Sequence, residues 1–256
     1  NSLLGEGGSL KPNFWRAVTD NDMGAQSQKN FAAWRTPKMK LRSLTVDKKL
    51  KTAVAVYNMP AVKSTLTLTY QVEANGTLVV TQDLKTTPGA KVSEMLRFGM
   101  VMNLPYDMDQ VQWNGRGPVE NYSDRKISQN VGIYHATADD LFYPYIRPQE
   151  TGTMSDLRWW NQTNKNGVGF RVESDKLFSA SALHYDLLTL DEGKEKKQRH
   201  SQSVEKSKYT NLFIDLVQSG VGGVDSWGGD GRARKGHRVE YKDYTFSFRI
   251  APKTLY

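Results

Sequence analysis

The chain has 256 residues, 38% of them hydrophobic, which is enough for one large domain with a sizeable core. It has no cysteine, so disulfides, thiolate metal sites and a cysteine nucleophile are excluded. The net charge of +8 raises the question of nucleic-acid binding. However, the basic residues are scattered, and their densest groups, at 194–199 and 232–238, lack the interleaved aromatics that stack on bases. We therefore expect no nucleic-acid partner.

Period-two alternation dominates residues 41–103 and predicts strands. In residues 62–72 one face is largely apolar and the other consists of threonines, lysine and glutamine, which is typical of a half-buried antiparallel strand. Asn75-Gly76 follows at once and predicts a hairpin into residues 77–81. With a turn at 86–89 and a strand at 94–102, this third of the chain predicts a meander.

The remaining segments complete an all-β prediction. Helical turns are expected only at 28–34 and 139–142, and strands return at 212–216 and 244–250. Residues 104–165 are rich in Pro, Gly, Asn and aromatics with little periodicity, so we interpret them as long ordered loops. The expected architecture is two large antiparallel sheets packed as a sandwich.

The first unusual segment, residues 12–24, holds two large aromatics, an arginine and two carboxylates. Asp20 and Asp22 present oxygens at alternate positions, which suits calcium or magnesium. Such a site needs six or more oxygens, and the others are not evident nearby. We favour the alternative, in which these carboxylates accept hydrogen bonds from backbone N–H groups or from Arg16.

The second segment, residues 113–125, contains Gly115, Gly117 and Pro118, which force a turn. Four charged residues around this turn predict an ion-pair network at a structural corner: Arg116, Glu120, Asp124 and Arg125. The alternative makes Glu120 and Asp124 a general acid and base, but the spacing does not require it.

The third segment, residues 219–229, is rich in glycine but lacks both the dinucleotide-binding fingerprint and the Gly-Lys-Ser/Thr of a phosphate loop. It carries Trp227, whose indole could cover the apolar C–H face of a pyranose while neighbouring polar groups bind hydroxyls. Packing of Trp227 in the core is an equally good interpretation at this point. The four histidines show no metal-ligand spacing, and no Gly-x-Ser-x-Gly elbow exists.

These segments, together with residues 143–150 and 156–159, resemble the C-terminal domain of bacterial family 2 β-galactosidases of the long, multi-domain type. The resemblance runs over nearly the whole chain. It implies a galactose-mutarotase-like supersandwich, with residues 1–256 forming a single domain cut from a longer chain. The absence of an initiator methionine fits that expectation. In such enzymes a TIM barrel hydrolyses terminal β-galactosides with retention.

The resemblance also implies roles for individual residues. Both catalytic carboxylates, about 5 Å apart in a retaining enzyme, belong to the barrel, so this chain is expected to hold none. Trp227 is lent to the sugar site and is supported by Asp225 and Ser226. Gly24 begins a mobile loop that runs to about residue 34 and closes near the galactosyl site.

The sequence departs from the family at residues 25–27, at Met154 and at 197–204, so contacts inferred from these positions are not carried over. Magnesium and sodium are expected for the full-length enzyme, with no metal or cofactor in this fragment. The expected partners are a β-galactoside and the catalytic barrel of the parent chain, which is expected to be a homo-oligomer. No stretch approaches the roughly 20 apolar residues of a membrane span, so no membrane partner is expected.

Two rival functions follow from the same sequence. A mutarotase would use a histidine base and a glutamate acid, and His184 and Glu150 are the candidates. Fold does not carry function, and the family's segments disfavour this alternative. A stand-alone carbohydrate-binding module is a stronger rival. It would bind sugar without any barrel, whereas a domain that only lends Trp227 to a larger site should hardly bind sugar by itself.

Overall fold

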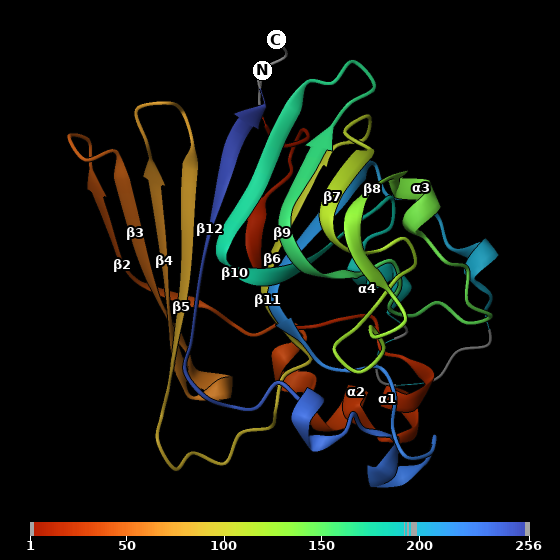
Figure 1. Cartoon of the computed structure of the whole chain (residues 1–256). Helices are drawn as coiled ribbons and strands as arrows, with labels where there is room; N and C mark the ends of the chain where they lie inside the picture. Colours follow the sequence, from red (N-terminus) through yellow and green to blue (C-terminus); the bar gives the residue numbers. More distant parts are fainter. Residues whose placement is uncertain (1–2, 192, 194, 196–198, 254–256) are drawn as a thin grey trace.

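A computed structural model describes residues 3–191, 193, 195 and 199–253 and consists mostly of antiparallel strands (Figure 1). The strands are β1 (Leu10–Asn13), β2 (Lys40–Asp47), β3 (Thr52–Met59), β4 (Ser64–Val72), β5 (Leu78–Thr86), β6 (Arg97–Pro105), β7 (Gln110–Gly117), β8 (Asn130–Thr137), β9 (Met154–Thr163), β10 (Gly169–Leu183), β11 (Tyr209–Gln218) and β12 (Tyr244–Lys253). The all-β prediction is confirmed.

Helical segments are short and lie between the strands. They are α1 (Asp20–Gly24), α2 (Ser27–Asn30), α3 (Ala138–Leu141), α4 (Leu187–Leu190), and the single turns η1 (Ala32–Trp34), η2 (Pro60–Val62), η3 (Ser201–Ser203), η4 (Gly228–Gly231) and η5 (Lys235–His237). The two expected helical turns are confirmed as α2 with η1 and as α3. None of the helices in the described part of the chain has the length and apolar character to cross a bilayer.

The long strand β10 organises the sheet. Its residues 169–173 pair with β12, its residues 179–183 pair with β11, and β9 pairs with it along both parts. The sheet therefore branches into β12-β5-β4-β3-β2, into β11-β6-β1, and into β9-β7-β8. The first branch projects from the body at the left of Figure 1, whereas α1 and α2 lie at its lower right.

The predicted hairpin is confirmed in detail. β4 and β5 pair from Ser64↔Thr86 to Val72↔Leu78, and the turn between them places Gly76 at φ +84°, a conformation that favours glycine. The side-chain oxygen of Asn75 accepts a hydrogen bond from the Thr77 amide at 3.0 Å. The alternation of β4 thus directs its leucines into the core.

Two predictions about organisation are wrong. β6 does not continue the meander, since it pairs with β1 and β11 in another branch of the sheet. Residues 104–165 are not mainly loops but contain β7, β8, β9 and α3. The central strand β9 lies between β7 and β10 and is buried at seven of its ten positions, and both of its faces mix polar with apolar residues, so its sequence shows no alternation.

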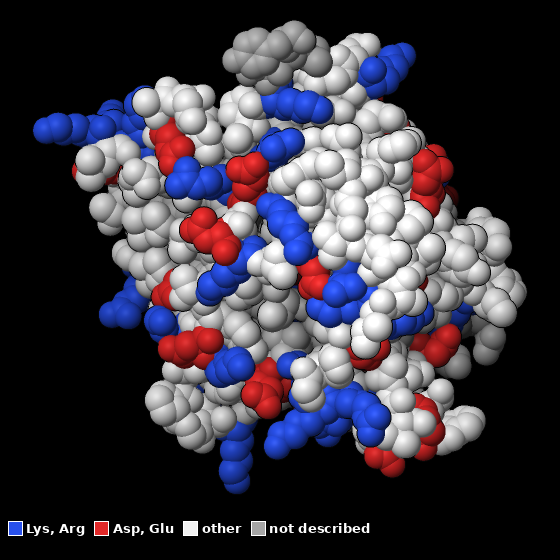
Figure 2. Space-filling model, in the orientation of Figure 1, with Lys and Arg blue, Asp and Glu red and all other residues white. Residues whose placement is uncertain are grey.

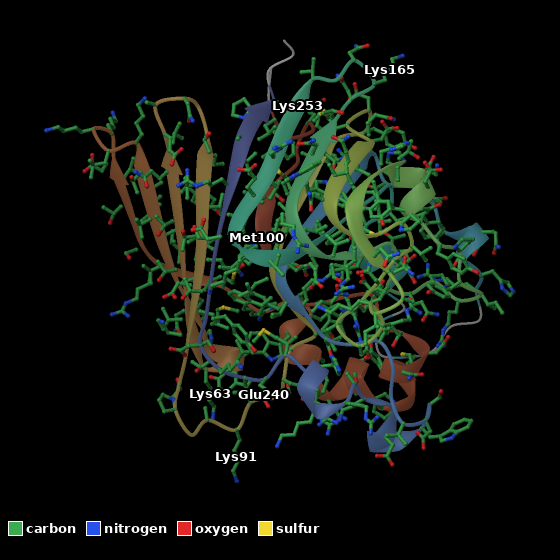
Figure 3. The ribbon with its side chains drawn as sticks, in the orientation of Figure 1. Lys63, Lys91, Met100, Lys165, Glu240 and Lys253 are labelled. Carbon is green, nitrogen blue, oxygen red and sulfur yellow. The ribbon has the colours of Figure 1, made fainter. Side chains whose placement is uncertain are left out.

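The core lies between the branches of the sheet. Met100 of β6 has no exposed surface and sits near the centre of the molecule in Figure 3. Trp113 of β7 and Trp160 of β9, which are paired in the sheet, stack at 5.7 Å between ring centroids. On the surface, lysines and arginines are interspersed with carboxylates (Figure 2). Of the two basic groups in the sequence, Lys194, Lys196 and Lys197 lie outside the described residues.

Leu66 and Leu44 provide a matched test of this packing, because they lie on one face of the same sheet at 0% and 60% exposure. Leu66→Ala should lower the free energy of unfolding by about 2–5 kcal/mol through lost burial and a residual cavity. Leu44→Ala in the isolated chain should change it by less than about 0.5 kcal/mol. Urea unfolding followed by circular dichroism measures both, and equal losses would show that β2 is packed in solution.

Candidate functional site

Trp227 lies on the surface, with 75% of its area exposed. It follows the glycine-rich loop that leaves β11, and its amide donates a hydrogen bond to Asp225 Oδ1 at 2.8 Å. This side-chain bond two residues back is an Asx turn, which fixes the backbone at the base of the indole. Core packing of Trp227 is therefore ruled out, and Asp225 shapes the turn that presents it.

Gly24, at the end of α1, touches the loop that carries Trp227. A Cβ atom on Gly24 would lie 1.8 Å from the carbonyl oxygen of Ser226, so only glycine permits this approach. Ser226 Oγ lies 3.1 Å from Asn21 Oδ1 of α1 and hydrogen-bonds to it. The structure thus brings together two segments that are 200 residues apart in the sequence.

A cavity of about 390 Å³ opens where these segments meet, within the size range of small-molecule sites. Gly24, Ser226 and Trp227 all line it, so three of the four predicted site residues share one cavity. Asp225 does not line it and acts through the Trp227 turn. The full lining is Asp20, Met23, Gly24, Gln26, Gln28, Lys29, Glu195, Ser226 and Trp227.

A buried arginine, Arg16, links α1 to the start of the loop that carries Trp227. The Arg16 guanidinium donates to both carboxylate oxygens of Asp22 at 2.9 Å, in a bidentate pair. The same group donates to the carbonyl oxygens of Ser219 and Gly220 at 2.6 and 2.9 Å. Arg16 and Asp22 are 1% and 4% exposed, so this link is shielded from water. The predicted Arg16–Asp22 bond is confirmed.

Asp20 and Asp22 do not form a common site. Asp22 also accepts a hydrogen bond from the Thr19 amide and closes a capping box at the start of α1. The Asp20 carboxylate instead hydrogen-bonds to the side chains of Arg147 and Gln149. Within the part of the chain that the structure describes, no three acidic or histidine side chains gather as a metal site would require.

The second segment forms a corner that also holds the Trp227 loop. Glu120 accepts from Arg125 at 2.5 Å, from the Gly152 amide at 2.7 Å and from Tyr145. Of the ion pairs predicted within this segment, the Glu120–Arg125 pair is present among the described residues, and the acid–base alternative loses support because these donors hold the Glu120 side chain in place. Arg116 pairs elsewhere, with Asp156 at 2.6 Å.

Asp124 makes a contact with the Trp227 loop that the sequence analysis did not predict. Its two carboxylate oxygens accept hydrogen bonds from the amides of Val221 and Gly222 at 3.1 and 2.8 Å. The loop is therefore fixed from two sides, by Arg16 on its carbonyls and by Asp124 on its amides. No local pattern could have predicted a bond across about 97 residues of sequence, although Asp124 did lie in a segment singled out for its composition.

His184 and Glu150, the candidates for a mutarotase pair, have separate partners. His184 stacks on Tyr106 and its two ring nitrogens hydrogen-bond to Asp139 and to the Tyr106 carbonyl. Glu150 accepts from Arg97 at 2.9 Å and from Thr153. Among the bonds of the described residues, none joins the two side chains, so the structure gives no support to this pair.

A buried ionic cluster joins Arg97 of β6 and Asp215 of β11 to Glu150. Arg97 is shared between Glu150 and Asp215, with Nε 3.3 Å from the Asp215 carboxylate, and all three side chains are at most 5% exposed. Burial raises the pKa of Asp215 to about 7, which Arg97 opposes and the Glu150 charge reinforces. Burial, reinforced by the Glu150 charge, thus favours the neutral form of Asp215 against the opposing effect of Arg97.

Comparison with known proteins relates this chain to β-galactosidases. The family model described as "Beta galactosidase small chain" matches residues 1–250. The β-galactosidase of Priestia megaterium is 31% identical over 229 residues, covering 88% of this chain and 21% of the relative. That of Lactobacillus delbrueckii is 35% identical over 222 residues, with 84% and 21% covered. The chain therefore spans about a fifth of the length of these relatives.

Solved structures with a similar course of the chain are an aldose epimerase homologue from C. elegans and a galactose mutarotase related enzyme from Lactobacillus acidophilus. Their TM-scores are 0.42 and 0.41, at 10% and 11% identity. The matches cover 89% and 87% of this chain, and 71% and 73% of those chains.

The contact between Gly24 and Ser226 can be tested by substitution. Gly24→Ala should push the Trp227 loop away, because its Cβ would collide with backbone rather than with a flexible side chain. Hydrogen exchange at the amides of 221–231 should then become at least tenfold faster. Gly229→Ala is the matched control, since a Cβ there meets no atom within 4 Å. Equal exchange in both variants would contradict the contact.

The Asp215 carboxyl predicts a pH dependence of stability. Between its ordinary pKa of 3.8 and about 7, the folded state keeps a proton that the unfolded chain releases. The free energy of unfolding should therefore fall by a few kcal/mol as the pH rises from about 4 to about 7. Asp215→Asn should remove this part of the fall, as measured by urea unfolding across pH. The exposed Asp175→Asn serves as control, and an identical fall in both variants would contradict the assignment.

Proposed function

The chain belongs to the β-galactosidase small-chain family, and from this premise we propose that it works as one part of a larger β-galactosidase. In that enzyme it lends Trp227 to the site that binds the galactoside. The observation that carries the proposal is the exposed indole of Trp227, held by a tied loop at the rim of the 390 Å³ cavity. An indole exposed to this degree and fixed at its base is prepared for a ligand.

The proposed role of Trp227 is to position the sugar. The flat indole covers the apolar C–H face of a pyranose, while polar side chains of the cavity, among them Asp20 and Gln28, lie where they could bind hydroxyl groups. Positioning of this kind lowers the entropy cost of reaching the reactive geometry. It requires no proton transfer by residues of this chain.

We place the chemistry in the larger part of the enzyme. Retaining hydrolysis, the mechanism of family 2, needs a nucleophile and an acid/base about 5 Å apart. The carboxylates around the site in this chain have other tasks: Asp22 binds Arg16, Asp124 holds the loop and Glu120 anchors the corner. We propose that magnesium and sodium are likewise bound in the larger part of the enzyme.

A carbohydrate-binding module is the second candidate, and the same exposed Trp227 supports it. The two proposals differ in what the isolated chain does. A binding module should bind galactosides by itself with a measurable dissociation constant. A lent platform supplies one wall of a site, so its affinity alone should be very weak.

Trp227→Ala in the complete β-galactosidase tests the positioning role. The KM for lactose should rise, and transfer of galactose to an acceptor sugar should fall, by about tenfold each, which corresponds to roughly 1.4 kcal/mol of lost contact. The kcat for an activated aryl galactoside should change by less than about threefold, because its leaving group needs little assistance.

Val224→Ala is the matched control, since Val224 is 74% exposed in the same loop but does not line the cavity. Trp227→Phe should recover part of the transfer activity by keeping an aromatic face. An unchanged KM together with unchanged transfer in Trp227→Ala would exclude the positioning role.

A further inference from the structure

The apolar face of β4 continues outward across β3 to the edge strand β2. The register aligns Leu68 with Ala55 and Leu44, and Leu66 with Tyr57 and Leu41. Paired residues of neighbouring antiparallel strands point to the same side of a sheet. Leu41, Leu44 and Val46 therefore extend the face whose inner part packs in the core, and we call these three residues the β2 patch.

Burial falls steeply along this face. Leu66 and Leu68 in β4 are 0% and 4% exposed, whereas Leu41, Leu44 and Val46 in β2 are 55%, 60% and 60% exposed. The opposite face of β2 carries polar residues such as Ser43 and Thr45. The apolar residues of β2 are thus confined to one face. A contiguous exposed apolar surface of this kind marks an interaction site.

The rim of the β2 patch carries a strong positive charge. Residues 38–51 contain six basic side chains and a single acidic one, Asp47. A second copy of this chain would bring the same basic rim to the contact, and like charges in juxtaposition oppose association. The occupant that fits is an apolar strip flanked by Asp and Glu side chains.

We propose that the β2 patch docks onto the remaining part of the β-galactosidase, through an apolar strip bordered by carboxylates. The proposal rests on the proposed function, in which this chain is part of a larger enzyme. Relatives are about four times as long as this chain, so they contain ample surface to cover the patch. The β2 patch shares no residue with the Trp227 cavity, and β2 lies at the left of Figure 1, whereas α1, which contributes Gly24 to that cavity, lies at the lower right.

Two separate contacts would fix the orientation of this chain on the enzyme. One contact at the Trp227 cavity leaves rotation about that point, whereas a second at the β2 patch removes it. The exposed leucines and valine of β2 then stabilise the assembled enzyme rather than the isolated chain. Orientation of Trp227 toward the sugar becomes a consequence of docking at a distance.

Cysteine labelling tests this proposal, because the chain has no cysteine of its own. Leu44→Cys and Thr45→Cys are introduced singly into the complete β-galactosidase, after its other reactive cysteines have been replaced. Both residues are exposed in this chain and adjacent in β2, but they point to opposite faces. We expect Leu44→Cys to react with a maleimide at least tenfold more slowly than Thr45→Cys.

Equal labelling rates would overturn the proposal. Protection of Leu44→Cys that disappears on dilution of the enzyme would also overturn it, because the patch would then contact a second copy. Val46→Cys, on the same face, repeats the test if Leu44→Cys assembles poorly. Failure of docking is distinguishable from failure of the sugar role, since the labelling needs no substrate and Trp227→Ala leaves the β2 patch intact.

Discussion

The buried guanidinium of Arg16 is the contact on which the candidate site depends. It binds Asp22 at the start of α1 and, at the same time, the carbonyls of Ser219 and Gly220 at the start of the Trp227 loop. A buried ion pair of this kind contributes little net stability by itself, but its geometry fixes which segments meet. With Asp124 binding the amides that follow, a glycine-rich loop gains a defined course despite its flexible composition.

The branching of the sheet at β10 explains why these segments meet at all. β1 and β11 both pair antiparallel with β6, so both strands end near the start of β6. The loop that leaves β11 therefore emerges close to the segment that follows β1. The loops of the site therefore start at the ends of paired strands. Paired strands are more rigid than loops, so they fix the starting points of these loops. The same branching leaves β2 at the far edge of a projecting sheet, where none of the described residues covers its apolar side.

Much of the fold followed from local pattern, and the failures have physical causes. Alternation identified β4, and Asn75-Gly76 identified the hairpin to β5, because both depend on neighbouring residues. β9 was not predicted, because both of its faces are largely buried and mix polar with apolar residues. Its sequence therefore lacks the alternation that indicates a strand. Trp227, Gly24 and Ser226 were named through the resemblance to a family, but their shared cavity, and the contacts of Asp124, depend on distant parts of the chain.

The central claim is that this chain shapes a galactoside site without containing the catalytic carboxylates. The most direct measurement is hydrolysis of a chromogenic β-galactoside by the isolated chain, compared with the complete β-galactosidase at equal molar concentration. The account predicts turnover by the complete protein and none above the uncatalysed rate by the isolated chain. Turnover by the isolated 256 residues would mean that a catalytic carboxylate pair lies within this chain, and it would contradict the account.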